Sequence, residues 1–247
     1  MDKQAVLGAF DRQIRRNPNG RVERDHNVIR SYTQGWTGVA WSALDQTSAD
    51  AVIAAQVERF AAQPWEWKHY DYDQPADLPA RLTAAGLAAE PAETLLVAEI
   101  ADLSLDVPAP QGVTLRTVVH EDDVEALVAV HDEVFGGDHS PVGRMLLDRG
   151  PDEVVAVVVM AGTTPISAAR VEFHHGTEFA GLWGGGTLPE WRGRGVFRAL
   201  VAHRARLAAD RGFRYLQVDA TPDSRPILER LGFVVLATTT PFTHPGA

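Results

Sequence analysis

Apolar positions in the second half of the chain repeat with two periods, and each period predicts one kind of element. Residues 154–160 form an unbroken apolar run typical of a buried strand, and residues 166–174 alternate as a half-buried strand does. Residues 121–135 and 196–209 carry apolar side chains at helical spacing. The other expected elements are strands at 115–119, 178–187, 215–220 and 233–237 and a short helix at 226–231. The order β-α-β-β-β-α-β-α-β predicts a mixed α/β domain.

A stretch without periodicity separates this region from the first part of the chain. Residues 106–112 contain two prolines and a glycine, and we expect them to form a linker. A long loop inside a single domain is the alternative, but the patterns on both sides of the stretch are complete. The sequence therefore predicts two domains, residues 1–105 and residues 113–247.

The two regions match each other in spacing when the first is shifted by 146 residues. Gly86 then falls on Gly232, and a helix expected at residues 50–62 falls on residues 196–208. Agreement in order and spacing is typical of an internal duplication. Two unrelated helix-strand-helix units are the alternative.

Composition excludes several classes of site. The chain of 247 residues contains no cysteine, which rules out disulfides, thiolate nucleophiles and cysteine metal sites, and its histidines lack the spacing of metal ligands. A net charge of −10 argues against a nucleic-acid partner. No apolar run could cross a membrane, and the N-terminus lacks a secretory signal. We expect no metal, no nucleic acid, no membrane and a cytoplasmic location, and a homodimer is left open.

The residues most indicative of chemistry lie between the strand at 178–187 and the helix that begins at Val196. Pro189 stops the strand ladder, and the turn Arg192–Gly195 then leads into the helix. The first N–H groups of a helix lack internal partners and lie at the positive end of its dipole. Glycines let the backbone approach a ligand, so this turn predicts a phosphate or pyrophosphate site.

Other phosphate-binding loops do not fit this turn. It lacks the GxxxxGK[ST] spacing of nucleotide triphosphatases, and it does not follow a first strand as a dinucleotide-binding GxGxxG does. A plain glycine turn before a helix remains the alternative at this point.

Two blocks of sequence resemble signatures of the GNAT superfamily of N-acetyltransferases. Residues 188–195, Leu-Pro-Glu-Trp-Arg-Gly-Arg-Gly, are similar to its [QR]xxGx[GA] loop, which follows a strand and a Pro-x-aromatic. Residues 219–233 end in Leu-Glu-Arg-Leu-Gly-Phe and resemble its last helix, which ends in Tyr-Glu-Lys-Leu-Gly-Phe. The resemblance covers residues 113–243. It implies a mixed, mostly antiparallel GNAT-type sheet flanked by helices, and with the duplication it implies two such domains in tandem.

The resemblance also implies an activity and a set of cofactor contacts. It implies transfer of an acetyl group from acetyl-coenzyme A to an amine by direct attack, without an acyl-enzyme. A small-molecule amine is the favoured acceptor, with a peptide or protein amine as the alternative. The implied cofactor-binding residues are Gly185, Gly186, Thr187, Arg192, Gly193, Arg194, Gly195, Val196, Phe197, Arg198 and Ser224.

The chain departs from the family pattern at two positions. Phe197 stands where the loop normally ends in Gly or Ala, so its side chain must find room. Leu228 stands at the position of the tyrosine that often protonates the departing thiolate. This second departure keeps open an alternative function, a non-catalytic module that senses acetyl-coenzyme A. A hydroxyl at Ser224 could contact the cofactor or simply cap the last helix.

The general base is sought among polar residues on the two strands that lead to the loop. Glu172 and His174 share one face of a strand because they are two residues apart. Glu178 lies at the start of the next strand. Each could relay a proton near the cofactor sulfur, and each could instead be an ordinary solvated strand residue.

The first region lacks the features of the loop. In the 146-residue alignment the loop falls on Gln46–Ala49, which has neither glycine nor arginine, and Thr47 or Ser48 is expected to cap the helix. We predict that this region is a degenerate copy that binds no cofactor and packs against the catalytic half or walls the acceptor site. Its tryptophans are expected in a core, with an aromatic substrate wall as the alternative: Trp36, Trp41, Trp65 and Trp67.

Overall fold

The computed structural model describes residues 1–246, which form two compact units. Unit 1 contains Met1–Leu96, Asp219–Ile227 and the residues from Val235 onward, and unit 2 contains Val97–Val218 and Leu228–Val234. The predicted division placed everything after residue 113 in one domain. The units instead interleave along the chain, because the C-terminal strand pairs within unit 1.

Unit 2 is built on a sheet in which five strands follow one another in space. Their hydrogen-bonded order is β11-β10-β9-β8-β7. Neighbours pair antiparallel from β7 to β10, whereas β10 and β11 are parallel. The strands are β7 (Val113–Thr117), β8 (Val154–Ala161), β9 (Thr164–Phe173), β10 (Phe179–Thr187) and β11 (Tyr215–Ala220). The apolar run of β8 is buried along nearly its whole length, as expected for a strand covered on both faces.

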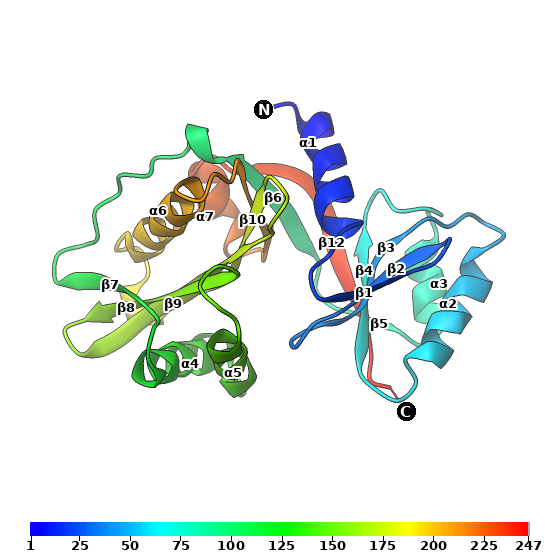
Figure 1. Cartoon of the computed structure of the whole chain (residues 1–247), viewed down its shortest axis with the longest axis horizontal. Helices are drawn as coiled ribbons and strands as arrows, with labels where there is room; N and C mark the ends of the chain where they lie inside the picture. The colour runs from blue at the N-terminus through cyan, green and yellow to red at the C-terminus, as the bar shows by residue number, and fades with distance from the viewer. Residues whose placement is uncertain (247) are drawn as a thin grey trace. The chain divides into compact units, whose positions relative to one another are not determined.

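Helices cover both faces of this sheet (Figure 1). On one face lie α4 (Glu121–Phe135) and α5 (Ser140–Asp148), and on the other lies α6 (Val196–Ala209). Leu127 and Val130 of α4 pack on Ala168. Because alternate residues of a strand share a face, residues 168, 170 and 172 of β9 lie on the face toward α4. The remaining short elements of this region are η2 (Ile100–Asp102), η3 (Pro189–Trp191) and α7 (Arg225–Arg230).

Unit 1 contains strands in the hydrogen-bonded order β1-β2-β3-β4-β12, with β5 also paired to β12. Its strands are β1 (Arg21–Arg24), β2 (Val28–Tyr32), β3 (Thr37–Ser42), β4 (Trp65–Tyr70), β5 (Ala88–Ala89) and β12 (Val234–His244). Its helical elements are α1 (Lys3–Phe10), η1 (Asp11–Arg15), α2 (Ala49–Arg59) and α3 (Leu78–Ala84). Strand β6 (Glu93–Glu99) contributes residues to both units. The predicted mixed α/β class and mostly antiparallel pairing are confirmed.

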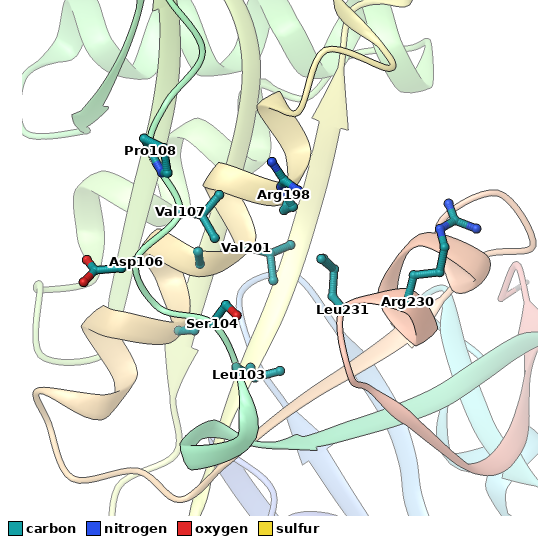
Figure 2. A pocket seen from close by; sticks show the side chains of 11 residues that line it. Leu103, Ser104, Asp106, Val107, Pro108, Arg198, Val201, Arg230 and Leu231 are labelled. Carbon is teal, nitrogen blue, oxygen red and sulfur yellow. The ribbon is translucent and has the colours of Figure 1, made fainter.

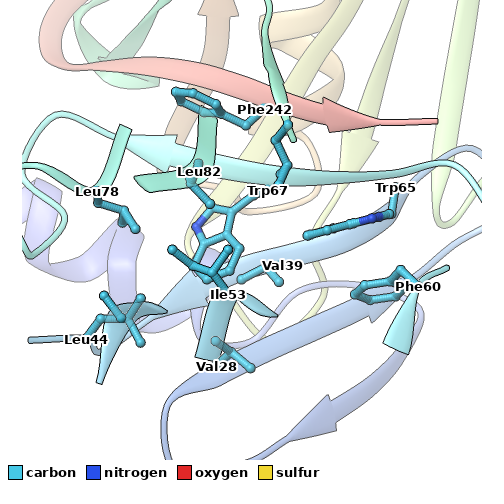
Figure 3. Close-up of a cluster of buried hydrophobic side chains, with 12 residues drawn as sticks. Val28, Val39, Leu44, Ile53, Phe60, Trp65, Trp67, Leu78, Leu82 and Phe242 are labelled. Carbon is cyan, nitrogen blue, oxygen red and sulfur yellow. The ribbon is translucent and has the colours of Figure 1, made fainter. Parts of the chain in front are cut away.

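The core of unit 1 is organised around two tryptophans of β4. Trp67 is fully buried among Ile53, Leu78 and Leu82, and the ring of Trp65 stacks on Phe60 with centroids 4.9 Å apart (Figure 3). These two rings therefore belong to a core, as the sequence predicted. The core residues come from α2, α3 and the strands β2, β3, β4 and β12, so each of these elements needs the others to exclude water.

The last helices of the two halves end in the same way. Gly86 follows α3 and Gly232 follows α7, both with positive φ, at +94° and +107°. After Gly86 the Leu87 N–H donates to the Leu82 carbonyl at 3.1 Å. After Gly232 the Phe233 N–H donates to the Leu228 carbonyl at the same distance, 3.1 Å. Strands β2, β3 and β4 also repeat the antiparallel-then-parallel pairing of β9, β10 and β11.

A buried ion pair joins η1 to the loop after β4 in unit 1. Arg15 Nη1 and Nη2 donate to the two carboxylate oxygens of Asp73 at 2.9 and 2.8 Å, and both side chains are almost fully buried. The guanidinium also stacks on the Tyr70 ring, 4.0 Å from its centroid. Because neither charge reaches water, each depends on the other for its stabilisation.

We expect Asp73→Ala to lower the free energy of unfolding of unit 1 by about 3–5 kcal/mol, since it removes the buried carboxylate that pairs with Arg15 and leaves only the more exposed Asp11 to balance that charge. Urea unfolding measures the change. The matched control is Asp50→Ala, which removes the partner of Arg81 at a site 77% exposed and should change stability by less than about 1 kcal/mol. Equal effects of the two substitutions would contradict the assignment.

Candidate active site

Strand β10 carries a bulge at its run of three glycines. Trp183 pairs with Arg170 of β9 and Gly186 pairs with Ala168, so Gly184 and Gly185 together face one residue of β9. Gly184 has φ of +59°, a conformation that side chains with a Cβ rarely adopt. The run of three glycines thus adopts a defined local geometry in the structure.

Strand β10 also parts from β11 close to this bulge. The two strands pair in register only from Phe179 to Gly181, opposite Tyr215 to Gln217, while β10 continues to Thr187. The edge of β10 from Leu182 onward therefore leaves its parallel neighbour. Two parallel strands that separate expose backbone N–H and C=O groups along the gap, and these groups can bond a ligand inserted there.

The turn Arg192–Gly195 has the conformation that the sequence predicted. Gly193 and Gly195 have φ of +73° and +86°, and Gly195 is the N-cap of α6. The first bond of the helix joins the Ala199 N–H to the Gly195 carbonyl at 3.0 Å, so the N–H groups before it have no partner within the helix. No side chain caps this end, so these N–H groups remain available to an anion.

Three arginines surround the start of α6. Arg192 Nε donates to the Thr187 carbonyl at 3.0 Å, which ties the turn to the end of β10. Arg194 stacks on the Trp191 ring, 4.8 Å from its centroid. Arg198 and both of these side chains are exposed, so their guanidinium groups can meet a ligand without a desolvation penalty inside the protein.

A cavity of about 400 Å³ lies along α6 within unit 2 (Figure 2). Arg198, Val201, Ala202 and Ala205 of α6 line one side at helical spacing, and Arg230 and Leu231 line another. Residues 103–108, part of them in the predicted linker, line the rest, with Leu103 and Val107 as apolar members. The cavity thus combines apolar walls with two cations, which suits an organic anion.

The acid–base candidates are placed differently by the structure. Glu172 pairs across the strands with Gly181, and the His174 Nε2 atom lies 3.3 Å from the position that a Cβ at Gly181 would take. Both therefore lie where β10 leaves β11. Glu178 precedes the first residue of β10, roughly 30 Å along the strand from the loop at 3.3 Å per residue, and it pairs with Arg214.

Glu172 is held between two arginines. Arg149 Nη1 and Arg170 Nε donate to its two oxygens at 2.9 and 2.8 Å. Burial by itself would raise the pKa of Glu172, but the charges and hydrogen bonds of Arg170 and Arg149 outweigh it and lower the pKa. Burial lowers the pKa of His174 to about 4, so this imidazole is neutral at pH 7. Glu172 is thus a carboxylate stabilised by two arginines, and His174 is an uncharged imidazole with a lone pair that can accept a proton.

Two departures from the expected motif are accommodated by packing. The Phe197 ring lies beside β10, with Cε2 3.0 Å from the position of a Cβ at residue 185, so Gly185 makes the room that this side chain needs. Leu228 is 2% exposed and offers no proton donor. The Ser224 hydroxyl donates to the Thr221 carbonyl at 3.3 Å, so its bond lies in the turn before α7.

His131 also lies at this bulge, although no motif in the sequence marks it. His131 lies on α4, is 1% exposed, and its Nε2 is 2.9 Å from the Gly184 carbonyl oxygen. Residues 131 and 184 are far apart in sequence, so only the tertiary structure brings them together. An aromatic cluster with Phe135 and His139 continues from it toward the surface.

The corresponding loop of unit 1 is closed by its own hydrogen bonds. The Asp45 carboxylate accepts the N–H groups of Thr47 and Ser48 at 2.9 and 2.8 Å, together with both of their hydroxyls. The predicted hydroxyl cap from Thr47 or Ser48 was wrong in detail, because Asp45 satisfies these donors. An anion site of the kind at Arg192–Gly195 is thereby filled by the protein itself.

Within residues 1–246, no three His, Asp or Glu side chains are grouped as metal ligands would be. In the same part of the chain, every helix is too short or too polar to cross a membrane.

Comparisons with known proteins agree with this geometry. A mycothiol acetyltransferase from Tsukamurella paurometabola is 26% identical over 208 residues, which are 74% of this chain and 68% of that protein. Residues 119–233 match the model of the acetyltransferase (GNAT) family. These matches support an acetyl-coenzyme A-dependent acyltransferase. Residues 119–233 of the chain form a GNAT acetyltransferase domain.

Solved structures show that the fold likeness extends beyond this segment. A GCN5-related N-acetyltransferase from Kribbella flavida has a TM-score of 0.70 at 20% identity and covers 99% of this chain and 95% of its own. A tandem GNAT protein from the clavulanic acid biosynthesis pathway has a TM-score of 0.62 at 15% identity, covering 91% of this chain and 81% of its own. At such identities the likeness concerns the fold.

We expect Glu172→Gln to lower the free energy of unfolding at pH 7 by about 1–3 kcal/mol, because two half-buried arginines lose a shared partner. Since the pKa of Glu172 is lowered in the folded state, its stabilisation is present above the usual carboxylate pKa and is lost as the pH falls through the lowered value. The difference between the two proteins should therefore shrink in acid, as urea titrations at several pH values can show. The control is Glu153→Gln, which removes the charge of a more exposed partner of Arg149.

Proposed function

We propose that the chain transfers the acetyl group of acetyl-coenzyme A to the amine of a small molecule. The observation that carries this proposal is the pairing of two features at one end of β10. An uncapped helix start with three arginines follows directly after a strand edge that has left its neighbour. The first feature suits a pyrophosphate, and the second suits the extended arm that leads from it to a thioester.

The order of β10, the turn Arg192–Gly195 and α6 along the chain assigns a part of acetyl-coenzyme A to each of them. Backbone N–H groups of Gly193, Gly195, Val196 and Phe197 would hold the pyrophosphate, with Arg192, Arg194 and Arg198 supplying charge. The cavity lined by Arg198 and Arg230 lies next along α6 and would receive the adenosine end. Backbone groups of Gly185, Gly186 and Thr187 would bond the arm and the thioester. Ser224 belongs to unit 1 and bonds to Thr221, so we assign it to the turn before α7 instead.

The reaction that fits these groups is direct aminolysis. The amine nitrogen forms a bond to the thioester carbon, the carbon–sulfur bond breaks, and the electron pair leaves on sulfur. The chain orients the thioester and donates an N–H to the oxygen that gains charge. A base removes the ammonium proton, and solvent protonates the thiolate, because the buried Leu228 carries no acid.

For the base we propose His174 ahead of Glu172. A neutral imidazole can accept a proton at pH 7, whereas the Glu172 carboxylate is already neutralised by two arginines and has a lowered pKa. Glu172 then orients Arg149 and Arg170 beside the acceptor. Glu178 lies at the far end of β10 and has no role in this scheme.

We further propose that the two halves arose as a tandem pair in which only the C-terminal copy acts on acetyl-coenzyme A. The repeated strand pairing and the matched Gly86 and Gly232 helix ends support the duplication. The hydrogen-bonded Asp45–Ser48 loop supports the loss of cofactor binding in the first copy. The tandem GNAT protein of the clavulanic acid pathway supports this arrangement by its fold.

A small-molecule acceptor is supported by the relative that is named for mycothiol. The competing proposal is a sensor that binds acetyl-coenzyme A without turnover. It is favoured by one observation, the buried Leu228 at the usual tyrosine position.

Acetyl-coenzyme A should raise the melting temperature, with a stabilisation of about 2.7 kcal/mol at 100 times its Kd. Gly193→Val should abolish the shift, because its φ of +73° is strained for valine and the turn must change. The matched control is Gly162→Val, at a hairpin glycine with φ of +62° and equally open surroundings. A ligand shift that survives in the Gly193 variant would contradict the loop assignment.

Release of free thiol from acetyl-coenzyme A should be slow alone and accelerated by an amine of the right shape. A library of small amines, monitored with a thiol reagent and mass spectrometry of the acetylated product, tests this. His174→Gln should lower kcat by about 10²- to 10⁴-fold, as loss of a general base does. Because the pKa of His174 is about 4, the base is already deprotonated at pH 6, and the fold decrease should stay constant from pH 6 to 9. Binding without turnover on any amine would support the sensor.

A further inference from the structure

We propose that His131 is a positioning residue for acetyl transfer, whose hydrogen bond to the Gly184 carbonyl aims the Gly185 N–H group at the thioester oxygen. The inference rests on the proposed function, because it takes β10 as the strand that holds the thioester. His131 lies on α4, outside the loop and outside every group assigned above to the cofactor or to proton transfer.

The contact is made at the one place where β10 leaves regular geometry. His131 Nε2 lies 2.9 Å from the Gly184 oxygen, and the imidazole is 1% exposed. A carbonyl oxygen can only accept, so Nε2 carries the proton and donates it. The bond therefore draws the Gly184 carbonyl out of the sheet toward α4.

Peptide geometry converts this pull into an orientation of the next N–H. The Gly184–Gly185 peptide is trans, since the cis bond within residues 1–246 is at Gln74–Pro75. In a planar trans peptide the carbonyl oxygen and the N–H point in opposite directions. Holding the Gly184 oxygen on the α4 side therefore turns the Gly185 N–H toward the opposite side, where β10 faces α6 and the start of the cofactor loop.

Packing on both faces keeps the peptide from turning over. A Cβ at residue 184 would lie 2.9 Å from His131 Cε1, and one at residue 185 would lie 3.0 Å from Phe197 Cε2. Both residues must be glycine to fit between these rings. Two glycines alone could adopt many backbone conformations, so the histidine bond is what selects one of them.

The charge state of His131 suits a permanent donor. Burial lowers the pKa of this imidazole to about 4, Arg170 and His139 act in the same direction, and Asp132 and the Gly184 bond oppose them. The ring stays neutral across the range in which an amine can be acetylated. It therefore acts as a fixed hydrogen-bond donor and leaves the proton of the acceptor to another group.

Isotope-edited infrared spectra of acetyl-coenzyme A labelled with ¹³C at its carbonyl provide the direct test, since a hydrogen bond lowers the carbonyl stretching frequency. Bound to the wild-type protein, the label should absorb at lower frequency than in water. His131→Leu should lose most of that shift, and His131→Gln should keep it, because the glutamine amide can donate from nearly the same place. His175→Leu is the control, since His175 also bonds a backbone carbonyl, at 2.7 Å, but at the exposed end of unit 2.

Kinetics with the best amine give a second readout. His131→Leu should lower kcat about 10- to 100-fold while KM for acetyl-coenzyme A changes by less than about threefold, as loss of an oxyanion donor affects the transition state more than binding. This fold decrease in kcat should be constant from pH 6 to 9, and His131→Gln should have most of the wild-type kcat. His131→Met replaces the leucine variant if that protein does not fold.

The outcomes separate this inference from the proposed function. If acetyl-coenzyme A neither stabilises the wild-type protein nor is consumed by it, the proposed function fails. If it binds and the leucine or methionine variant keeps the carbonyl shift and kcat of the wild type, only the role of His131 fails. Equal loss in the glutamine and leucine variants would likewise overturn the donor role, because size rather than hydrogen bonding would then explain the effect.

Discussion

Strand β10 has to stay bonded to one neighbour while it leaves the other, and the candidate site depends on this constraint. It remains paired with β9 up to Thr187 but parts from β11 after Gly181. An extra residue in the bulge lets the strand change direction without losing its outer ladder. Helices press on both faces of the bulge, through His131 on one and Phe197 on the other. The glycine run is thus required by packing as much as by any ligand.

Local sequence signals were sufficient where the chemistry is local. The turn at Arg192–Gly195 could be predicted because its glycines, its arginines and the following helix are contiguous. The cores of the strands and of α4 and α6 followed from periodicity. Helix α5 was not predicted, since Pro141 and Gly143 interrupt its pattern. Arg149, which bonds Glu172, follows α5, and His131, which bonds Gly184, lies on α4, and no spacing in the sequence indicates contacts between such distant residues.

The division into domains shows the same limit. Residues 106–112 contain no helix or strand, yet they lie inside unit 2, where Val107 and Pro108 line the cavity along α6 and Asp106 pairs with Arg206. A segment that proline and glycine content predicts to be a linker can therefore also form part of a cavity wall. The strand β12 has ordinary β-sheet character in the sequence, and nothing in its own residues indicates that it pairs with β4.

The interleaving of the units has a consequence for synthesis. Residues 1–96 leave the ribosome first, but the core of that unit includes Phe242 from β12, and β4 bonds to β12 along its whole length. Because domains generally fold as the chain emerges, residues 1–96 keep an open strand edge on β4 until β12 has been synthesised. The catalytic half, which emerges between these segments, is made while its neighbour is still incomplete. An unfinished edge of this kind is a natural point for chaperone contact or for pairing between nascent chains.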